Sequence, residues 1–134
     1  MGSVLPPEEL MEFMIKKCQK CGAVVEVQHD CTCKDCGINC CGQQMVELKP
    51  NSVDASFEKH VPQYEIDGSA MKVFVNHVME EDHFIEWIAV MSENKITKVF
   101  FKPGDNPEAV FHYAKGAKLF AFCNKHGLWT NDVK

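Results

Sequence analysis

The sequence predicts an all-β protein, in which a small cysteine-rich domain precedes an antiparallel β-sandwich. Short apolar stretches alternate with turn residues from residue 63 onward, which is typical of a sandwich. Seven of the eight cysteines fall within residues 18–41, and residues 29–42 have too few apolar residues for a core of their own. The length of 134 residues suits one compact domain, or one domain with a small satellite. We place the boundary at the linker Lys49-Pro50-Asn51-Ser52, which divides residues 1–50 from residues 51–134.

The first expected element is a short N-terminal helix over residues 6–17. Pro6 and Pro7 suit a first helical turn, and acidic residues follow them directly. Lys16 and Lys17 suit the other end, where the helix dipole favours cations. We interpret this helix as an amphipathic cap on the rest of the domain.

The remainder of the first domain is predicted to contain two short strands. Residues Ala23 to Val27 are β-prone, and Gln44 to Leu48 can form a second strand. Between them, residues 29–42 are crowded with Cys, Gly, Asp and Asn. Such a segment holds one shape only if a metal ion or disulfides crosslink it.

The second domain is predicted to consist of hairpins. An Asp-Gly turn at residues 67 and 68 is a hairpin signal, and a Ser-Glu-Asn-Lys turn separates a later pair of strands. We expect Lys118 to Cys123 to be the last strand. The paired strands are Gln63–Ile66 with Met71–Val75, and Phe84–Met91 with Ile96–Phe101.

Charge and hydropathy exclude several partner classes. The net charge of −5 argues against nucleic acid as a partner. No apolar run approaches the roughly 20 residues of a membrane-spanning helix, so we expect no membrane partner. The first residues lack the charged-then-apolar pattern of a secretory signal, which predicts a cytoplasmic protein. In that compartment crowded cysteines are metal ligands or redox groups rather than a disulfide framework.

A cysteine-knuckle motif predicts one metal site. Cys18 and Cys21 form a CxxCG motif, and Cys40 and Cys41 precede another glycine. Four thiolates can bind one tetrahedral ion, with metal–sulfur distances of about 2.3 Å. Zinc and iron both accept four thiolates, so the motif does not decide between them.

Three further cysteines leave the ligand set open. Cys33 and Cys36 form a second CxxC motif, and Cys31 lies just before it. Four of the seven cysteines can hold either a mononuclear ion or a [4Fe–4S] cluster, and the others are then spare thiols.

A second constellation combines histidines with the remaining cysteine. Cys123 and His126 are three residues apart, and Gly127 after them allows the chain to turn. His77 and His83 bracket a short acidic loop, and His60 precedes Val61-Pro62. Several imidazoles with one thiolate exceed four ligands and suit iron or copper better than zinc.

Four separated motifs resemble the superoxide reductase family, in its desulfoferrodoxin-like form with a desulforedoxin-like N-terminal domain. The resemblance runs from about Cys18 to Trp129. The motifs are Phe57-Glu58-Lys59-His60-Val61-Pro62, the segment from His77 to Ile88, Phe101-Lys102-Pro103-Gly104-Asp105, and Cys123-Asn124-Lys125-His126-Gly127-Leu128-Trp129.

The resemblance implies an immunoglobulin-like β-sandwich over residues 51–134 that carries a non-haem iron. It also implies a reaction in which superoxide takes one electron and two protons and leaves as hydrogen peroxide. Lys59 is the implied cation beside the open iron position, and Glu58 is the implied carboxylate that binds ferric iron afterwards. The implied iron ligands are His60, His77, His83 and His126, with Cys123 axial.

The resemblance also implies a second iron centre, with Cys18, Cys21, Cys40 and Cys41 as ligands. Cys31, Cys33 and Cys36 depart from the family pattern, so Cys33 or Cys36 can replace one of the four. Mononuclear iron is the expectation, with a [4Fe–4S] cluster or zinc as alternatives. Trp87 and Trp129 are interpreted as packing residues rather than redox groups.

By the same resemblance, we expect superoxide as substrate, a rubredoxin-like electron donor and a homodimer. One alternative is an electron-transfer iron–sulfur protein that works through the N-terminal cysteines. Another is a zinc-stabilised binding module, which leaves Cys123 and His126 unexplained. A dismutase is disfavoured, because a strong thiolate donor lowers the potential of the ferric site that must accept an electron from superoxide.

Overall fold

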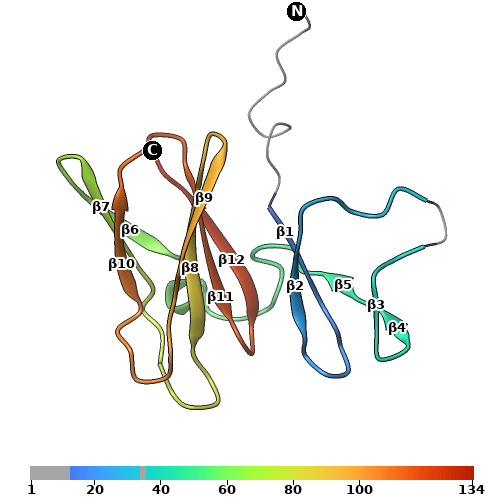
Figure 1. The fold of residues 1–134 in the computed structure, drawn as a ribbon. Coiled ribbons are helices and arrows are strands. Elements are labelled where there is room, and N and C mark those ends of the chain that lie inside the picture. The colour runs from blue at the N-terminus through green and yellow to red at the C-terminus, as the bar shows by residue number, and fades with distance from the viewer. Residues whose placement is uncertain (1–12, 34–35) are drawn as a thin grey trace, which may run out of the picture. The chain divides into compact units, whose positions relative to one another are not determined.

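The structure is a computed structural model that describes residues 13–33 and 36–134. The chain divides into two compact units, Met1–Lys49 and Pro50–Lys134. Every regular element among the described residues is a strand, apart from one 3₁₀ turn, η1 (Phe57–Lys59). Figure 1 labels the strands, numbered in chain order. Within the described part of the chain, no helix has the length and apolar character needed to cross a membrane.

The first unit contains a three-stranded antiparallel sheet and a small hairpin. In the sheet β1 is central, with β2 on one side and β5 on the other. Ile15 of β1 is 1% exposed, and Val27 and Met45 of the same unit are also buried. The strands are β1 (Met14–Lys17), β2 (Val24–Val27) and β5 (Val46–Glu47), and the hairpin pairs β3 (Asn39–Cys40) with β4 (Gln43–Gln44).

The predicted N-terminal helix is wrong at its C-terminal end, because Met14–Lys17 form strand β1. This strand pairs with both β2 and β5, so hydrogen bonds to two neighbours outweigh a local helix signal of only a few residues. Lys16, expected at a helix end, is nearly buried, and its ammonium binds Asp30 at 2.7 Å. The rest of the predicted helix, residues 6–12, lies outside the described residues.

The second unit is a seven-stranded β-sandwich of two antiparallel sheets. One sheet has the order β10-β7-β6 and the other the order β12-β11-β8-β9, the arrangement of an immunoglobulin-like fold. The strands are β6 (Gln63–Asp67), β7 (Ala70–Phe74), β8 (Ile85–Ser92), β9 (Lys95–Phe100), β10 (Glu108–His112), β11 (Lys118–Cys123) and β12 (Gly127–Asp132).

The two sheets share one apolar core. Met71 and Val73 of β7 pack against a cluster that includes Ile85 and Ile88 of β8 and Leu119 of β11. All five side chains are 0% exposed, and burial of apolar side chains is the main term that stabilises such a sandwich. The all-β prediction and the hairpins β6–β7 and β8–β9 are confirmed. Strands β10 and β12 were not predicted from the sequence.

The topology gathers one set of chain segments at a single end of the sandwich. Strands β8 and β12 both pair antiparallel with β11, so the start of β8, the end of β11 and the start of β12 meet there. The β7–β8 connection reaches the same end, at the bottom of the sandwich in Figure 1. Histidines and a cysteine occupy these ends.

Candidate metal centres

Five side chains from four parts of the sandwich bring their donor atoms together. His60 follows η1, His77 follows β7, His83 precedes β8, Cys123 ends β11 and His126 lies in the β11–β12 turn. One donor atom from each residue lies within 4.8 Å of the others. All five were selected from the sequence, and the structure brings all five together.

The four imidazoles form a closed ring around one point. Adjacent rings in the order His60, His77, His83 and His126 have centroids 4.6–5.0 Å apart, and His126 closes the circle onto His60. Every adjacent pair is edge-to-face, with interplanar angles of 69–88°. Cys123 Sγ lies 3.5 Å from His77 Nε2 and 3.9 Å from His126 Nδ1. The arrangement is a ring of four imidazoles with one thiol beside it.

The interatomic distances fit a metal ion. Two nitrogens at right angles, each about 2.1 Å from one ion, are about 3.0 Å apart. His60 Nε2 and His126 Nδ1 are 3.0 Å apart. Nε2 of His83 is buried and, among the described residues, has no hydrogen-bond partner. A buried ring nitrogen without a partner is costly unless it binds something, and a metal ion accounts for it.

Backbone carbonyls select the ring nitrogen that faces the group. Nδ1 of His60 hydrogen-bonds Ser56 O at 2.7 Å, and Nδ1 of His77 hydrogen-bonds Val78 O. With the proton on Nδ1, the Nε2 lone pair of each ring is free for a metal. Burial lowers the pKa of His60, of His77 and of His83, as desolvation disfavours their charged forms. Burial thus favours the neutral form of these three rings, which is the form that binds metals.

Burial has the opposite effect on the thiol of Cys123. It raises the pKa of this thiol above its usual value, while backbone N–H groups of Lys125 and His126 partly offset the rise. The N–H of His126 points at Cys123 Sγ over 3.4 Å. A buried thiolate needs compensating charge, which a bound cation supplies.

Asn124 links the Cys123 segment to the segment that carries His83. Its Oδ1 accepts the N–H of Phe84 at 3.0 Å, and its Nδ2 donates to Asp82 O at 3.0 Å. Its own N–H donates to Phe84 O at 3.2 Å. These three bonds fix the backbone on both sides of His83. Sequence reasoning missed this role, because an asparagine between two candidate ligands carries no spacing signal of its own.

Trp129 packs against the histidines of the donor group. Its ring stacks on His60 with a centroid distance of 4.8 Å and an interplanar angle of 24°, and its Nε1 donates to His126 O at 3.1 Å. Trp129 is 0% exposed, and Phe57 packs edge-on against its ring. Trp87 instead stacks on Phe122, and neither residue belongs to the core cluster shared by the two sheets.

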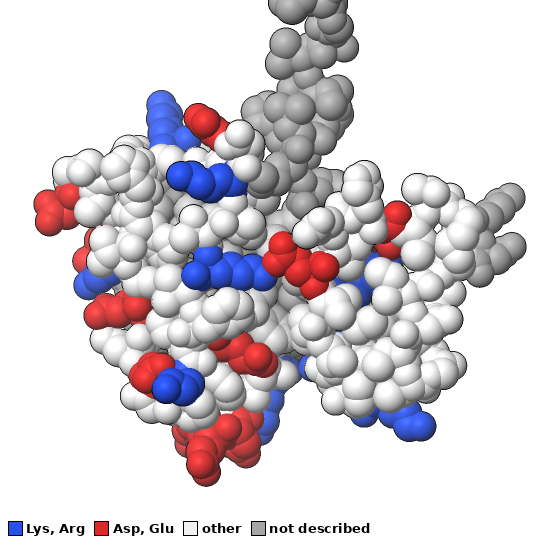
Figure 2. Space-filling view, in the orientation of Figure 1, with Lys and Arg blue, Asp and Glu red and all other residues white. Residues whose placement is uncertain are grey.

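Glu58 and Lys59 lie on η1 directly before His60, and both are exposed. They are not among the five grouped donors. The loop from Glu80 to Asp82, between two of the histidines, is also exposed and acidic, and Lys125 pairs with Asp82 at 3.6 Å. Acidic side chains gather at the lower end of the sandwich unit in Figure 2. An anion that approaches this end meets mostly negative charge.

The four cysteines of the knuckle motif form a second group in the first unit. Sγ of Cys21 lies 3.6 Å from Sγ of Cys40, which lies 3.9 Å from Sγ of Cys41. Two sulfurs on a tetrahedral ion with 2.3 Å bonds are about 3.8 Å apart, so the distances fit. Gly22 adopts φ +83°, which lets the chain turn so that the Cys21 N–H points at Sγ of Cys18 over 3.4 Å.

The four thiols cannot all ionise without a cation. The backbone N–H of Cys21 lowers the pKa of Cys18 to about 6, whereas hydrogen bonding with Cys21 Sγ raises the pKa of Cys40 to about 12. The pKa of Cys41 is also raised, mainly by hydrogen bonding with the Cys21 side chain. A divalent ion that binds all four sulfurs replaces these protons.

Cys33 and Cys36 are not part of this group. They form a disulfide with each other, and Cys31 is a free, exposed thiol. The structure therefore does not place either residue as a substitute ligand.

Fold and donors together define a class: immunoglobulin-like β-sandwich proteins with a four-histidine, one-cysteine metal group and a four-cysteine group, both consistent with iron centres. A family model described as Desulfoferrodoxin matches residues 52–132. A desulfoferrodoxin from Desulfarculus baarsii is 44% identical over 134 residues, covering 94% of this chain and 98% of that protein. The chain belongs to the desulfoferrodoxin family.

Two further comparisons are with superoxide reductases. A superoxide reductase from Thermococcus kodakarensis is 36% identical over 112 residues, covering 66% of this chain and 97% of that protein. The crystal structure of the superoxide reductase from Treponema pallidum matches with a TM-score of 0.67 at 23% identity, covering 90% of this chain and 99% of that chain. The latter match establishes the fold.

Proposed function

We propose that the protein is a superoxide reductase, which converts superoxide, one electron and two protons into hydrogen peroxide. The observation that carries the proposal is the closed ring of four imidazoles with one thiol beside it, from His60, His77, His83, His126 and Cys123. Family membership and a relative named superoxide reductase support it.

The five grouped residues are the proposed iron ligands. Iron held by them would supply one electron and, because five donors would leave one of six positions free, a place for a small ligand. Neutral imidazoles keep the charge of the site low, and the Cys123 thiolate donates electron density. A strong donor disfavours the return of an electron from substrate to the site, which separates a reductase from a dismutase.

Lys59 and Glu58 have separate proposed roles on η1. Lys59 supplies the local positive charge that draws an anion to an end of the sandwich rich in carboxylates. Glu58 would supply a carboxylate ligand to oxidised iron held by these residues. Both side chains are exposed, and both residues directly precede the proposed ligand His60 in the sequence.

The four-cysteine group is proposed to hold a second iron. We propose mononuclear iron, since the sulfur distances fit one tetrahedral ion, with residues 1–50 as its domain and residues 51–134 as the catalytic domain. A rubredoxin-like protein is the proposed electron donor, and the chain is proposed to form a homodimer. An electron-transfer protein that works through the four cysteines alone is the competing function, which the following experiment distinguishes.

The test is a stopped-flow reaction of the reduced, iron-loaded protein with superoxide. We expect His126→Ala to abolish the fast oxidation of the protein by superoxide. Cys41→Ser, the matched variant in the four-cysteine group, is expected to keep it in a single turnover. Fast oxidation that survives in His126→Ala and disappears in Cys41→Ser would move the activity to the other group and contradict the proposal.

A further inference from the structure

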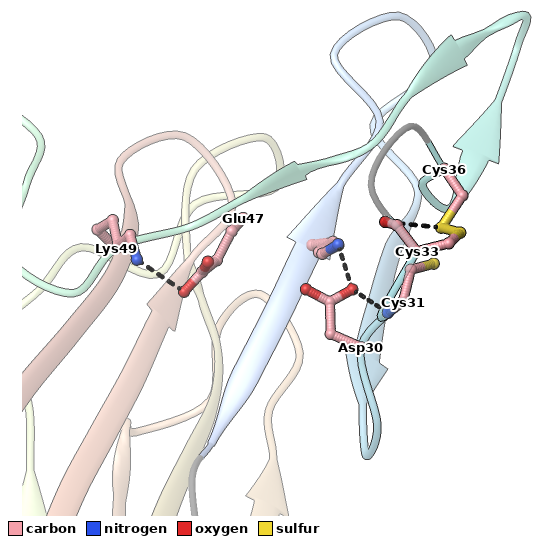
Figure 3. Close-up of polar contacts among 7 residues, drawn as sticks. Asp30, Cys31, Cys33, Cys36, Glu47 and Lys49 are labelled. Carbon is pink, nitrogen blue, oxygen red and sulfur yellow. Dashed lines mark hydrogen bonds and ion pairs between the residues drawn. A yellow bond between two sulfur atoms is a disulfide. The ribbon is translucent and has the colours of Figure 1, made fainter.

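Three cysteines lie outside both donor groups and have no role in the proposed reaction. Cys33 and Cys36 form a disulfide, with Cα atoms 5.7 Å apart, and Cys31 is a free, exposed thiol two residues earlier. Figure 3 shows the three together on the segment that leads into β3. A thiol–disulfide site needs an accessible disulfide, and here a free thiol also lies close to it in the sequence.

The chain on either side of this segment contacts a strand of the first unit. The N–H of Cys31 donates to Asp30 Oδ1 at 2.8 Å, and the same oxygen accepts Lys16 Nζ of β1 at 2.7 Å (Figure 3). After the disulfide, a Cβ on Gly37 would lie 2.7 Å from the side-chain Cδ of Gln44, so the backbone at Gly37 lies against this side chain of β4. The residues before and after the disulfide thus contact strands β1 and β4 of the same unit.

The disulfide contributes little as a structural crosslink. Cys33 and Cys36 are three residues apart, and crosslinks that close such short loops remove the least entropy from the unfolded chain. The unit also has a separate crosslinking element, the four-cysteine group formed by Cys18, Cys21, Cys40 and Cys41. Cys33 is exposed, and exposure to attack is typical of labile rather than structural disulfides.

We propose that Cys33 and Cys36 form a reversible dithiol–disulfide site, reduced by a dithiol and reoxidised by hydrogen peroxide. In the reducing half, one thiolate of the dithiol attacks the exposed Cys33 sulfur and Cys36 leaves as a thiolate. The second thiol of the reductant then attacks the mixed disulfide, which leaves Cys33 and Cys36 reduced and the reductant as its disulfide.

The oxidising half consumes one peroxide. The Cys33 thiolate attacks hydrogen peroxide to give a sulfenic acid and, after protonation, one water. Cys36 then attacks this sulfur, which restores the disulfide and releases a second water. The net reaction is dithiol plus hydrogen peroxide to disulfide plus two waters. Hydrogen peroxide is the product of the proposed superoxide reaction, so the oxidising half rests on that proposed function for its peroxide. The reducing half is independent of it.

The site can be tested on the iron-loaded protein with dithiothreitol and added peroxide, without superoxide. Trypsin cleaves after Lys34, between the two cysteines, so an intact disulfide joins two tryptic peptides and is measured directly by mass spectrometry. Thiols are alkylated before digestion. Cys31, free and exposed, is the internal standard and is expected to be alkylated in both states.

Dithiothreitol is expected to lower the amount of the joined peptides about tenfold, and one equivalent of peroxide to restore them, while the visible absorbance of the four-cysteine iron is unchanged. With excess dithiothreitol, Cys33→Ser is expected to slow peroxide removal about tenfold, and Cys31→Ser to leave it unchanged.

A disulfide that is reduced only when the chain unfolds would be structural. Reduction that releases iron would assign the pair to the metal centre. Peroxide removal that is equal in Cys33→Ser and wild type would exclude the peroxide step. Each of these results overturns the proposal.

Discussion

Replacing Asn124 by alanine tests how the sandwich positions His83. The variant removes two hydrogen bonds, one from Phe84 N–H and one to Asp82 O, and leaves the histidine between two backbone groups that have lost their partners. The Asp82 carbonyl is exposed, so water replaces that bond at a cost of about 1 kcal/mol. The Phe84 N–H is partly buried, and its loss of a partner costs about 2 kcal/mol.

The expected total is about 3 kcal/mol of unfolding free energy, measured by urea denaturation of the metal-free protein. Iron affinity, measured by competition with a chelator, is expected to fall by about tenfold to a hundredfold, as for other residues that orient a metal ligand. Asn124→Asp keeps the acceptor but loses the donor, so about one third of the destabilisation is expected from it.

Asn51→Gly is the matched control. The Asn51 side chain also makes two bonds to the backbone: its Nδ2 donates to Thr130 O at 3.3 Å, and its Oδ1 accepts the N–H of Thr130 at 2.9 Å. Its φ of +58° is one that glycine adopts without strain. This variant is expected to lose comparable stability and to keep its iron affinity. An Asn124→Ala protein that unfolds within about 0.5 kcal/mol of wild type, or that binds iron equally well, would refute the positioning role.

Three shorter predictions concern the same end of the sandwich. Cys123→Ser is expected to abolish the thiolate-to-iron charge-transfer band in the visible spectrum, and a surviving band would show that another residue supplies the sulfur. Lys59→Ala is expected to keep the iron, to slow the superoxide reaction and to weaken its dependence on ionic strength, with recovery in Lys59→Arg; an unchanged rate would remove Lys59 from the reaction. Burial lowers the pKa of His60, of His77 and of His83 below the unfolded value of 6.5, so in the metal-free protein their stability contribution is complete above about pH 6.5 and decreases as pH falls toward the lowered values. Urea midpoints that do not change between pH 7.5 and pH 5.5 would contradict this.

The sequence predicted the sandwich better than the smaller unit, for a physical reason. The hairpins β6–β7 and β8–β9 have clear turn residues between apolar runs, and both formed as predicted. Strand β12 begins at Gly127, which was interpreted only as a turn residue, and it is held by pairing with β11 along its whole length. Strand β1 has local signals for a helix, and only its pairing with β2 and β5 reverses them.

The candidate sites divide in a similar way. Spacing identified Cys123 with His126 and Cys18 with Cys21, since two ligands close in sequence reach one ion from a single turn. Which ring nitrogen faces the group, and the part that Asn124 plays, depend on backbone atoms that the fold brings near, such as Ser56 O. These contacts leave no pattern in the sequence.

The most direct test of the proposed activity is the stoichiometry of superoxide consumption by the iron-loaded protein with a stoichiometric one-electron donor. The proposal predicts that each superoxide consumed oxidises one donor molecule and yields one hydrogen peroxide, with no dioxygen released. Half an equivalent of peroxide, half an equivalent of dioxygen and an unchanged donor would identify a dismutase and would contradict the proposal.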